Sequence, residues 1–278
     1  MTEDKLQTIH GSTIQHGPHN NRVYLMKLNK NNVSSTLSDI EKIAGTNHYG
    51  KIFAKVPASS SVVFQLKGYV MEAYIPGYYN GQEDAFFLSR FLTEDRKHLP
   101  REDLSVLQNI LTKQKNLPEK KEHPIKNMKP EETDVMAELY KRVFPTYPFP
   151  IHDPGYLQKT MEDHISYFGL YENKKLIALS SAEKDTYNRA VEMTDFAVLP
   201  EYRGNNISYY LLEKMEKEMK KEGYRTFYTI ARLKAPGMNL TFLKKGYQYS
   251  GTLINNTNIS GQIESMNVLY KNAVSDLF

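Results

Sequence analysis

The chain has 278 residues, and its 36 lysines and arginines against 32 acids give a formal net charge of +4. Apolar residues make up 40% of the sequence, which suffices for packed cores and is too much for a disordered chain. There is no cysteine, so disulfides, thiolate nucleophiles and cysteine-ligated zinc are excluded. The small positive excess suits an anionic ligand but falls short of the basic block of a nucleic-acid binder.

The length indicates one large domain or two modest ones. No apolar run approaches the roughly 18 residues that a membrane-spanning helix needs, and the sequence opens on the polar, acidic stretch MTEDKLQTIH. We therefore expect a soluble cytoplasmic protein that acts on neither membranes nor nucleic acids. The eight histidines lack metal-ligand spacing, so no metal is expected. The oligomeric state stays open, a homodimer included.

The first part of the chain has the pattern of a small mixed α/β unit. Its predicted elements are strands at 22–28, 51–56, 70–79 and 86–92, with helices at 35–45 and 94–111. The charged segment 112–129 contains two prolines and no apolar period, which is typical of a linker. We therefore predict two domains, 1–122 and 123–278, with the boundary near His123.

The second part predicts the order β, α, β-meander, α, β, α, β, β. Its elements are a short strand at 125–128, a helix at 130–144, strands at 166–171, 175–184 and 190–199, a helix at 209–223, a strand at 224–232, a helix at 236–246, and strands around 247–255 and 263–271. The link at 143–157 reads as a proline-rich loop. This order indicates a mixed central sheet flanked by helices.

A glycine and two asparagines, Gly204, Asn205 and Asn206, stand just before the helix at 209–223. Such a turn directs backbone N–H groups toward an anion, and the helix dipole adds positive potential. An ordinary polar cap before a surface helix explains the same residues. Spacing alone does not decide between the two interpretations.

The run RGNNIS resembles the signature Q/R-x-x-G-x-G/A of the GNAT family of N-acetyltransferases, and VLPEYRG before it is similar to their V-x-P-x-x-R-G. Arg203 takes the first position, Asn206 that of the central glycine and Ser208 the last. Asn206 departs from the pattern, although asparagine tolerates left-handed backbone well. The resemblance spans about 125–271 and implies a GNAT fold, acetyl-CoA as co-substrate and direct acetyl transfer to an amine.

In this resemblance the pyrophosphate contacts backbone N–H groups of the loop, and the pantetheine follows the preceding strand. The implied cofactor-binding residues are Phe196, Ala197, Val198, Arg203, Gly204, Asn205, Asn206, Ile207, Ser208, Asn239 and Phe242. The Val198 N–H is the implied donor to the thioester carbonyl. Arg203 as a solvated charge and Asn239 as a helix-surface residue are the alternatives. The family's acid tyrosine falls on Phe242, which lacks a hydroxyl, so that role is vacant or passes to water or a tyrosine such as Tyr228.

An amine with a pKa of about 10.4 is mostly protonated at neutral pH, so a nearby proton acceptor speeds acetyl transfer. Glu192 and Asp195 lie on the strand at 190–199, where alternation places them on opposite faces. The resemblance to histone-type members favours Glu192 as the base. A β-bulge brings in Asp195 instead, and a salt bridge or an exposed strand face is the structural alternative.

The phrases YPFPIHDPGYL, AVEMTDFAVLPEYRG and IESMNVLYK are similar to the β-lysine N-acetyltransferase branch of the family. This narrower resemblance implies acetylation of the side-chain amine of β-lysine to N6-acetyl-β-lysine. Asp195, Asp153 and Glu264 are candidates for an ammonium, and Arg232 for the carboxylate. The acceptor-site candidates are Tyr147, Phe149, His152, Asp153, Arg232 and Glu264. Another small amine or amino acid, or a non-catalytic acyl-CoA-binding module, is the alternative function.

Two phrases repeat along the chain: FQLKGY at 64–69 and FLKKGY at 242–247. The predicted elements around both follow the same order, so we interpret the first part as a degenerate GNAT-like half domain. It lacks the arginine-glycine turn, and we expect no coenzyme A there. Tyr74, Tyr78 or Tyr79 is a candidate to close the acceptor cleft, with buried core aromatics as the alternative.

Overall fold

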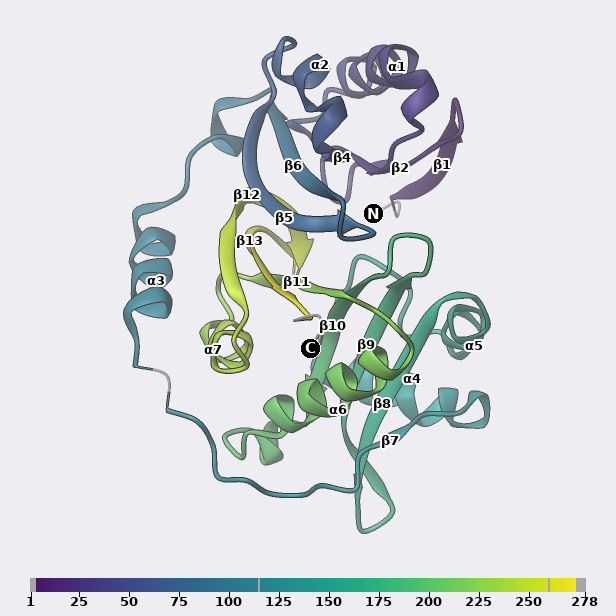
Figure 1. Cartoon of the computed structure of the whole chain (residues 1–278), viewed down its shortest axis with the longest axis vertical. Coiled ribbons are helices and arrows are strands. Elements are labelled where there is room, and N and C mark those ends of the chain that lie inside the picture. Colours follow the sequence, from purple (N-terminus) through teal and green to yellow (C-terminus); the bar gives the residue numbers. More distant parts are fainter. Residues whose placement is uncertain (1–3, 115, 260, 274–278) are drawn as a thin grey trace.

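The computed structural model describes residues 4–114, 116–259 and 261–273, which form two mixed β-sheets with helices packed against them (Figure 1). The first sheet has six strands in the order β1-β2-β3-β4-β6-β5. Its elements are β1 (Lys5–Ile9), β2 (Ser12–Gly17), β3 (Arg22–Lys27), α1 (Val33–Thr46), β4 (Lys51–Pro57), α2 (Ser61–Gln65), β5 (Val70–Tyr79) and β6 (Glu83–Phe91). We call this part the N-terminal half.

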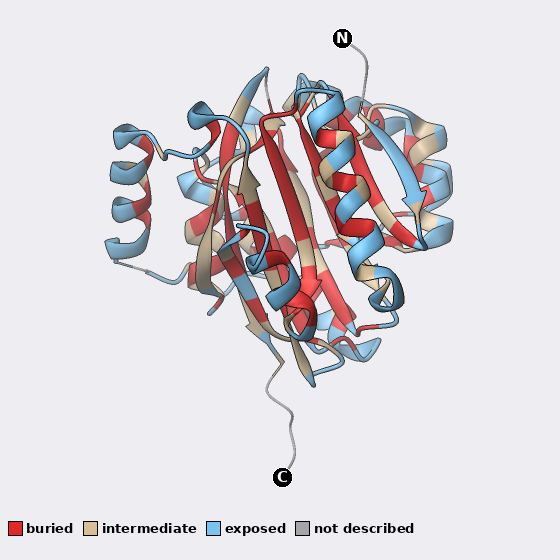
Figure 2. Ribbon diagram, turned by 90° about the horizontal axis from the view of Figure 1, so that it is seen from above, coloured by how far each residue is buried: buried red, intermediate tan, exposed pale blue. Residues whose placement is uncertain are grey.

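The second sheet has seven strands in the order β12-β13-β11-β10-β9-β8-β7. Its elements are β7 (Lys126–Asn127), α4 (Thr133–Val143), α5 (Pro154–Asp163), β8 (Ile165–Glu172), β9 (Lys175–Asp185), β10 (Ala190–Val198), α6 (Ile207–Lys221), β11 (Thr226–Arg232), α7 (Pro236–Lys244), β12 (Gln248–Ile259) and β13 (Gln262–Asn272). We call this part the C-terminal half. Figure 2 shows buried residues concentrated on the strands and exposed residues on the outer helix faces.

The segment between the two sheets follows α3 (Arg101–Thr112), and its described residues, 113–114 and 116–125, have no regular structure before β7. In Figure 1 it runs along the outside of the molecule past α6. The Tyr210 hydroxyl donates to the Glu119 carbonyl at 2.8 Å, and the His123 ring lies 4.5 Å from the Tyr210 ring. The predicted linker is thus an extended crossing attached to the first turn of α6. The division at 122/123 stays a prediction.

Both halves repeat one topology. In each, two parallel strands are joined by a helix, β3-α1-β4 and β10-α6-β11, and a short helix and an antiparallel hairpin follow. The short helices α2 and α7 are followed by Gly68 and Gly246, whose φ angles are +81° and +82°. Phe64 meets Tyr69 edge-on at 5.3 Å, and Phe242 meets Tyr247 at 4.9 Å. The predicted half-copy is therefore present in the fold.

Two parts of the fold differ from expectation. The β1–β2 hairpin was not predicted, because β1 is an exposed edge strand without an apolar face. The helix α5 lies where the sequence indicated a loop. Asp153 caps it by accepting from the Gly155 N–H at 3.0 Å, and Pro154 occupies its first turn. Proline therefore starts a helix here and does not extend the loop.

The two halves share a core between their sheets. It contains Phe53, Ile75 and Tyr78 from the N-terminal half with Tyr228 and Leu253 from the C-terminal half. The equivalent edge strands β5 and β12 meet at Gly251, where an added Cβ would clash with the Glu72 carbonyl oxygen. Glycine at this position therefore permits close contact between the halves.

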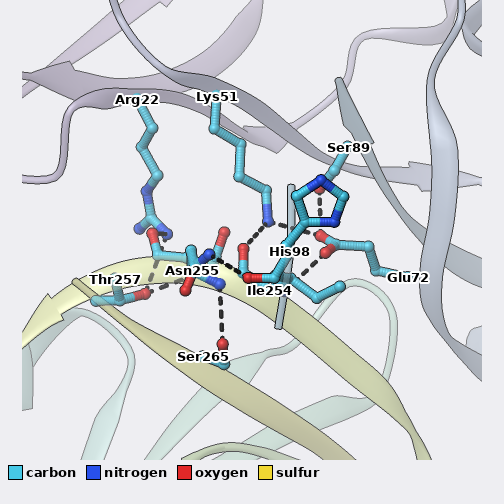
Figure 3. A network of polar contacts seen from close by, with 10 residues as sticks. Arg22, Lys51, Glu72, Ser89, His98, Ile254, Asn255, Thr257 and Ser265 are labelled. Carbon is cyan, nitrogen blue, oxygen red and sulfur yellow. Dashed lines mark hydrogen bonds and ion pairs between the residues drawn. The ribbon is translucent and has the colours of Figure 1, made fainter. Parts of the chain in front are cut away.

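A buried ion pair fastens this contact (Figure 3). The Lys51 ammonium donates to Glu72 and to the Ile254 carbonyl, both at 2.7 Å, and Glu72 accepts the Ile254 N–H at 2.7 Å and the Ser89 hydroxyl. A bulge in β12 between Leu253 and Thr257 turns this backbone toward the N-terminal half. The side chains of Lys51 and Glu72 are 0% and 4% exposed, so burial lowers the pKa of Lys51 to about 8 even beside Glu72.

Replacing Lys51 with methionine leaves the Glu72 carboxylate buried without its cation. We expect the free energy of unfolding to fall by about 3–5 kcal/mol, because an uncompensated buried charge is costly. Urea unfolding measures it. The control is Lys30→Met, which breaks an exposed pair with Glu83 and should cost about 1 kcal/mol or less. Equal losses in the two variants would show that the buried pair does not fasten the halves.

Candidate active site

The site begins where β10 and β11 stop pairing. Only Ala190–Glu192 of β10 pair with Thr226–Tyr228 of β11, although β10 continues to Val198 and β11 to Arg232. On the other edge of β10, the Leu199 N–H donates to the Ile177 carbonyl at 3.0 Å. Because successive N–H groups of a strand point to opposite edges, the Val198 N–H points to the edge that has left β11. This places the predicted backbone donor at an unpaired edge.

The loop after β10 has the conformation expected of an anion-binding turn. Gly204 and Asn206 adopt positive φ angles of +86° and +56°, and residues 203–206 are exposed. The helix α6 begins at Ile207 without a side-chain cap, so no side chain takes up its first N–H groups. Arg203 folds back, and its Nε donates to the Val198 carbonyl at 3.2 Å. The loop can therefore accept a diphosphate through backbone groups.

Glu192 is the last residue of β10 that pairs with β11, and it lies beside Glu183 on β9 and Tyr228 on β11. Burial, then the charge of Glu183, raise the pKa of Glu192 to about 8, while Lys55 and the Tyr228 hydroxyl oppose the rise. Burial also raises the pKa of Glu183. Glu192 is thus a carboxyl group that changes protonation close to neutral pH, as a general base requires.

The β-bulge proposed for Asp195 is present. The register of β10 against β9 shifts between Thr194 and Ala197, and Asp195 has a φ of +54°. Its carboxylate accepts from the Tyr147 hydroxyl, from Ser181 at 2.6 Å and from Thr194 at 3.3 Å. Burial raises the pKa of Asp195, and these hydroxyls oppose the rise. Asp195 therefore holds the α4–α5 loop, and its donors make it a weaker base than Glu192.

The N-terminal half also reaches the carboxyl groups of Glu183, Glu192 and Asp195, which we call the acid cluster. The Lys55 ammonium donates to the Tyr78 hydroxyl at 3.0 Å, and Tyr78 donates to Asp185 at 3.0 Å. Tyr78 is 1% exposed, as expected of a buried core aromatic, which was the alternative to a residue that closes the acceptor cleft. Sequence reasoning missed Lys55 and Glu183. Lys55 comes from the other sheet, and no local pattern brings it to Glu192. Glu183 pairs with Glu192 across the neighbouring strands β9 and β10, and this pairing was the available signal.

Several acceptor candidates lie elsewhere or are already paired. Asp153 is the cap of α5 and is exposed, so it does not face the acid cluster. Arg232 donates to Glu264 through two bonds of 2.9 and 2.7 Å, and the two side chains neutralise each other. Arg232 also lies four residues along β11 from Tyr228, about 13 Å by strand rise. In this structure these side chains already have partners, and their roles in charge recognition stay predictions.

The remaining candidates are side chains that pack within the C-terminal half. Tyr147 bonds Asp195, Phe149 packs on the core of the C-terminal half, and the half-buried His152 has no partner for Nε2 among the described residues. Asn239 is fully buried and donates to the Arg232 and Ala235 carbonyls, both at 2.9 Å. Its side chain is therefore packed inside the C-terminal half and faces no open space.

Phe242 is 1% exposed and meets Phe196 edge-on at 5.5 Å, which joins α7 to β10. The neighbouring Tyr228 hydroxyl keeps its proton at neutral pH, because burial and nearby tyrosines and acids raise its pKa well above 10. The described part of the chain has no group of three or more histidines, aspartates or glutamates placed to hold a metal. None of its helices combines the length and apolar character needed to cross a membrane.

Comparison with known proteins identifies the family. Residues 133–237, from α4 to the start of α7, match the acetyltransferase (GNAT) family. The chain is 43% identical over 272 residues to beta-lysine N(6)-acetyltransferase of Methanococcus maripaludis, with 96% of this chain and 98% of that protein covered. The chain belongs to the GNAT acetyltransferase family. The predicted resemblance is confirmed.

Two further relatives also match this acetyltransferase along most of its length. N-acetyltransferase YodP of Bacillus subtilis is 32% identical, with 94% of this chain and 95% of that protein covered. Beta-lysine N(6)-acetyltransferase of Methanosarcina mazei is 31% identical, with 82% and 93% covered. These alignments are too long to lie in the C-terminal half alone, so they include the N-terminal half.

Replacing Gly204 with valine should weaken binding of coenzyme A about 10-fold or more, because a β-branched residue is strained at a φ of +86°. Calorimetric titration with coenzyme A measures the affinity. Gly68→Val is the matched control, since Gly68 has a φ of +81° in the half without the loop. It should cost stability and leave the affinity unchanged. Equal affinity for coenzyme A in the two variants would show that this loop does not bind the cofactor.

Proposed function

We propose that this acetyltransferase transfers the acetyl group of acetyl-CoA directly to the side-chain amine of β-lysine and forms N6-acetyl-β-lysine. The observation that carries the proposal is the 43% identity to a beta-lysine N(6)-acetyltransferase along nearly the whole of both chains. The acid cluster of Glu183, Glu192 and Asp195 supports it, because an acceptor with two ammonium groups needs negative charge around it. Small molecules are then the reactants, and the cytoplasm is the proposed compartment.

The residues around the β10–α6 loop suit acetyl-CoA, which supplies an acetyl group activated as a thioester. The backbone N–H groups of 204–208 would hold its pyrophosphate, with positive potential from α6. The Val198 N–H would donate to the carbonyl oxygen as negative charge develops on it. Phe196 and Phe242 exclude water from this edge of β10.

Glu192 would take the proton of the attacking amine. A carboxylate with a pKa of about 8 is a stronger base than an ordinary glutamate and is still partly ionised at neutral pH. The same burial that raises this pKa favours the neutral form of an amine placed beside it. Both changes bring the two pKa values closer and make proton transfer easier.

The acceptor is tested by following thiol release from acetyl-CoA with β-lysine, lysine, ornithine and spermidine. We expect kcat/KM to be highest for β-lysine by about 10-fold or more, since misplaced polar groups in a built site are costly. Mass spectrometry and NMR of the product should place the acetyl group on N6. A higher kcat/KM for another amine would show that this amine, and not β-lysine, is the acceptor. The absence of thiol release with any amine would favour an acyl-CoA-binding module.

Replacing Glu192 with glutamine should lower kcat about 10²-fold at neutral pH and leave the affinity for coenzyme A unchanged. In the wild type, kcat/KM should rise with pH through about 8, because only ionised Glu192 accepts a proton, and the variant should lack this limb. Glu131→Gln, at an exposed site outside the cluster, is the control. Equal losses of kcat and of coenzyme A affinity would indicate a structural role for Glu192.

The same substitution gives a stability readout. Folding raises the pKa of Glu192 from 4.5 to about 8, so folding favours its protonated form. The stability of the wild type should therefore fall relative to Glu192→Gln as the pH rises through this interval. Thermal unfolding between about pH 5 and pH 9 measures the difference, which a solvated Glu192 would not show.

A further inference from the structure

One face of β4 points toward the C-terminal half and carries Lys51, Phe53 and Lys55, since alternate residues of a strand share a face. Lys51 forms the buried contact with β12 (Figure 3), and Phe53 is 1% exposed in the shared core. Lys55 lies about 13 Å from Lys51 along the strand and is half-buried. The buried contact of Lys51 with β12 therefore fixes where along β4 the Lys55 side chain meets the second sheet.

Lys55 is held against the acid cluster by its neighbours. Its ammonium lies 4.9 Å from the ring centre of Tyr78 and 5.8 Å from that of Tyr228, and it donates to the Tyr78 hydroxyl at 3.0 Å. An ammonium carries three N–H donors, and this bond uses one. Burial alone lowers the pKa of Lys55, but Tyr24, Tyr79 and the acids Glu192 and Asp185 together raise it. The lysine is therefore a cation at neutral pH.

Two other basic groups of the C-terminal half already have acidic partners. Arg232 is neutralised by Glu264 through two bonds. His164 lies 3.9 Å from Glu183 at an outer edge, where both side chains are more than two-fifths exposed. Lys55 thus supplies positive charge to the inner side of the cluster, next to the carboxyl groups that suit an ammonium.

We propose that Lys55 binds the carboxylate of the acceptor and so selects amino acids over diamines that lack this group. The inference rests on the proposed function and extends it, because it assigns acceptor recognition to the N-terminal half. The acids of β9 and β10 attract the ammonium groups of the acceptor, and Lys55 of β4 binds the carboxylate beside them. An amino acid with a side-chain amine carries both kinds of charge, whereas a diamine leaves Lys55 without a partner.

The test compares acceptors that differ only in the carboxylate. β-Lysine and 1,4-diaminopentane form such a pair, since the diamine has a hydrogen where β-lysine has its carboxylate. For Lys55→Met, kcat/KM for β-lysine should fall about 10- to 100-fold, as expected for a lost hydrogen bond between charged groups. For the diamine it should change less than about threefold when both enzymes are compared at a pH where Glu192 is ionised in each, because loss of Lys55 also raises the pKa of Glu192. Lys67→Met, at an exposed lysine of the same half, should change neither value.

Equal losses for both acceptors in Lys55→Met would overturn the proposal and show that Lys55 acts through Glu192 or the fold. Should that variant unfold, Lys55→Arg and Lys55→Gln decide. Arginine should keep the preference for the carboxylate, and glutamine should lose it. Retention of the preference by Lys55→Gln would also overturn the proposal.

Failure of the proposed acceptor is separated by two more pairs, lysine with 1,5-diaminopentane and ornithine with 1,4-diaminobutane. If the wild type prefers lysine or ornithine to β-lysine, the acceptor assignment fails. Lys55 is then tested on the preferred pair, where its replacement should again remove the preference for the carboxylate. A wild type that prefers the diamine in every pair would contradict the role of Lys55.

Discussion

The separation of β10 from β11 beyond Glu192 is the constraint on which the site depends. As long as two strands pair, their backbone groups satisfy each other and bind nothing else. Once pairing stops, the inner N–H groups of β10 face an open edge, and the strand leads directly into the Gly204 turn. The same break leaves Glu192 as the last paired acid, beside the start of that edge. One feature therefore places both the proposed cofactor-binding groups and the proposed base.

The N-terminal half changes the chemistry of this edge by covering it. Covering removes water, and the loss of water raises the pKa of Glu192. Grouping Glu192 and Asp195 under this cover, with the part-exposed Glu183 beside them, is unfavourable for the charged forms of these carboxyl groups. The shared core around Phe53 and the buried contact of Lys51 with β12 offset that cost. Stability gained at the interface thus permits a reactive arrangement in the cleft, as is common for active sites.

Sequence reasoning succeeded where local rules apply. The Gly204 loop, the helix after it and the half-copy marked by Gly68 and Gly246 follow from short patterns, and all three are in the fold. It failed where distant segments decide: no local pattern pairs Arg232 with Glu264 or brings Lys55 onto the second sheet. The roles of the site residues stay predictions, because geometry places the groups without showing the reaction.

The equivalence of β4 and β11 in the repeated topology has an evolutionary consequence. Each strand pairs in parallel with the strand before its helix and antiparallel with a hairpin strand. In a homodimer of identical subunits, any substitution on such a strand appears at both symmetry-related places. Fusion into a single polypeptide removes that restriction. One copy can then keep the neutral Tyr228 beside the acids while the other carries the cationic Lys55, so gene fusion lets two related strands acquire different side chains.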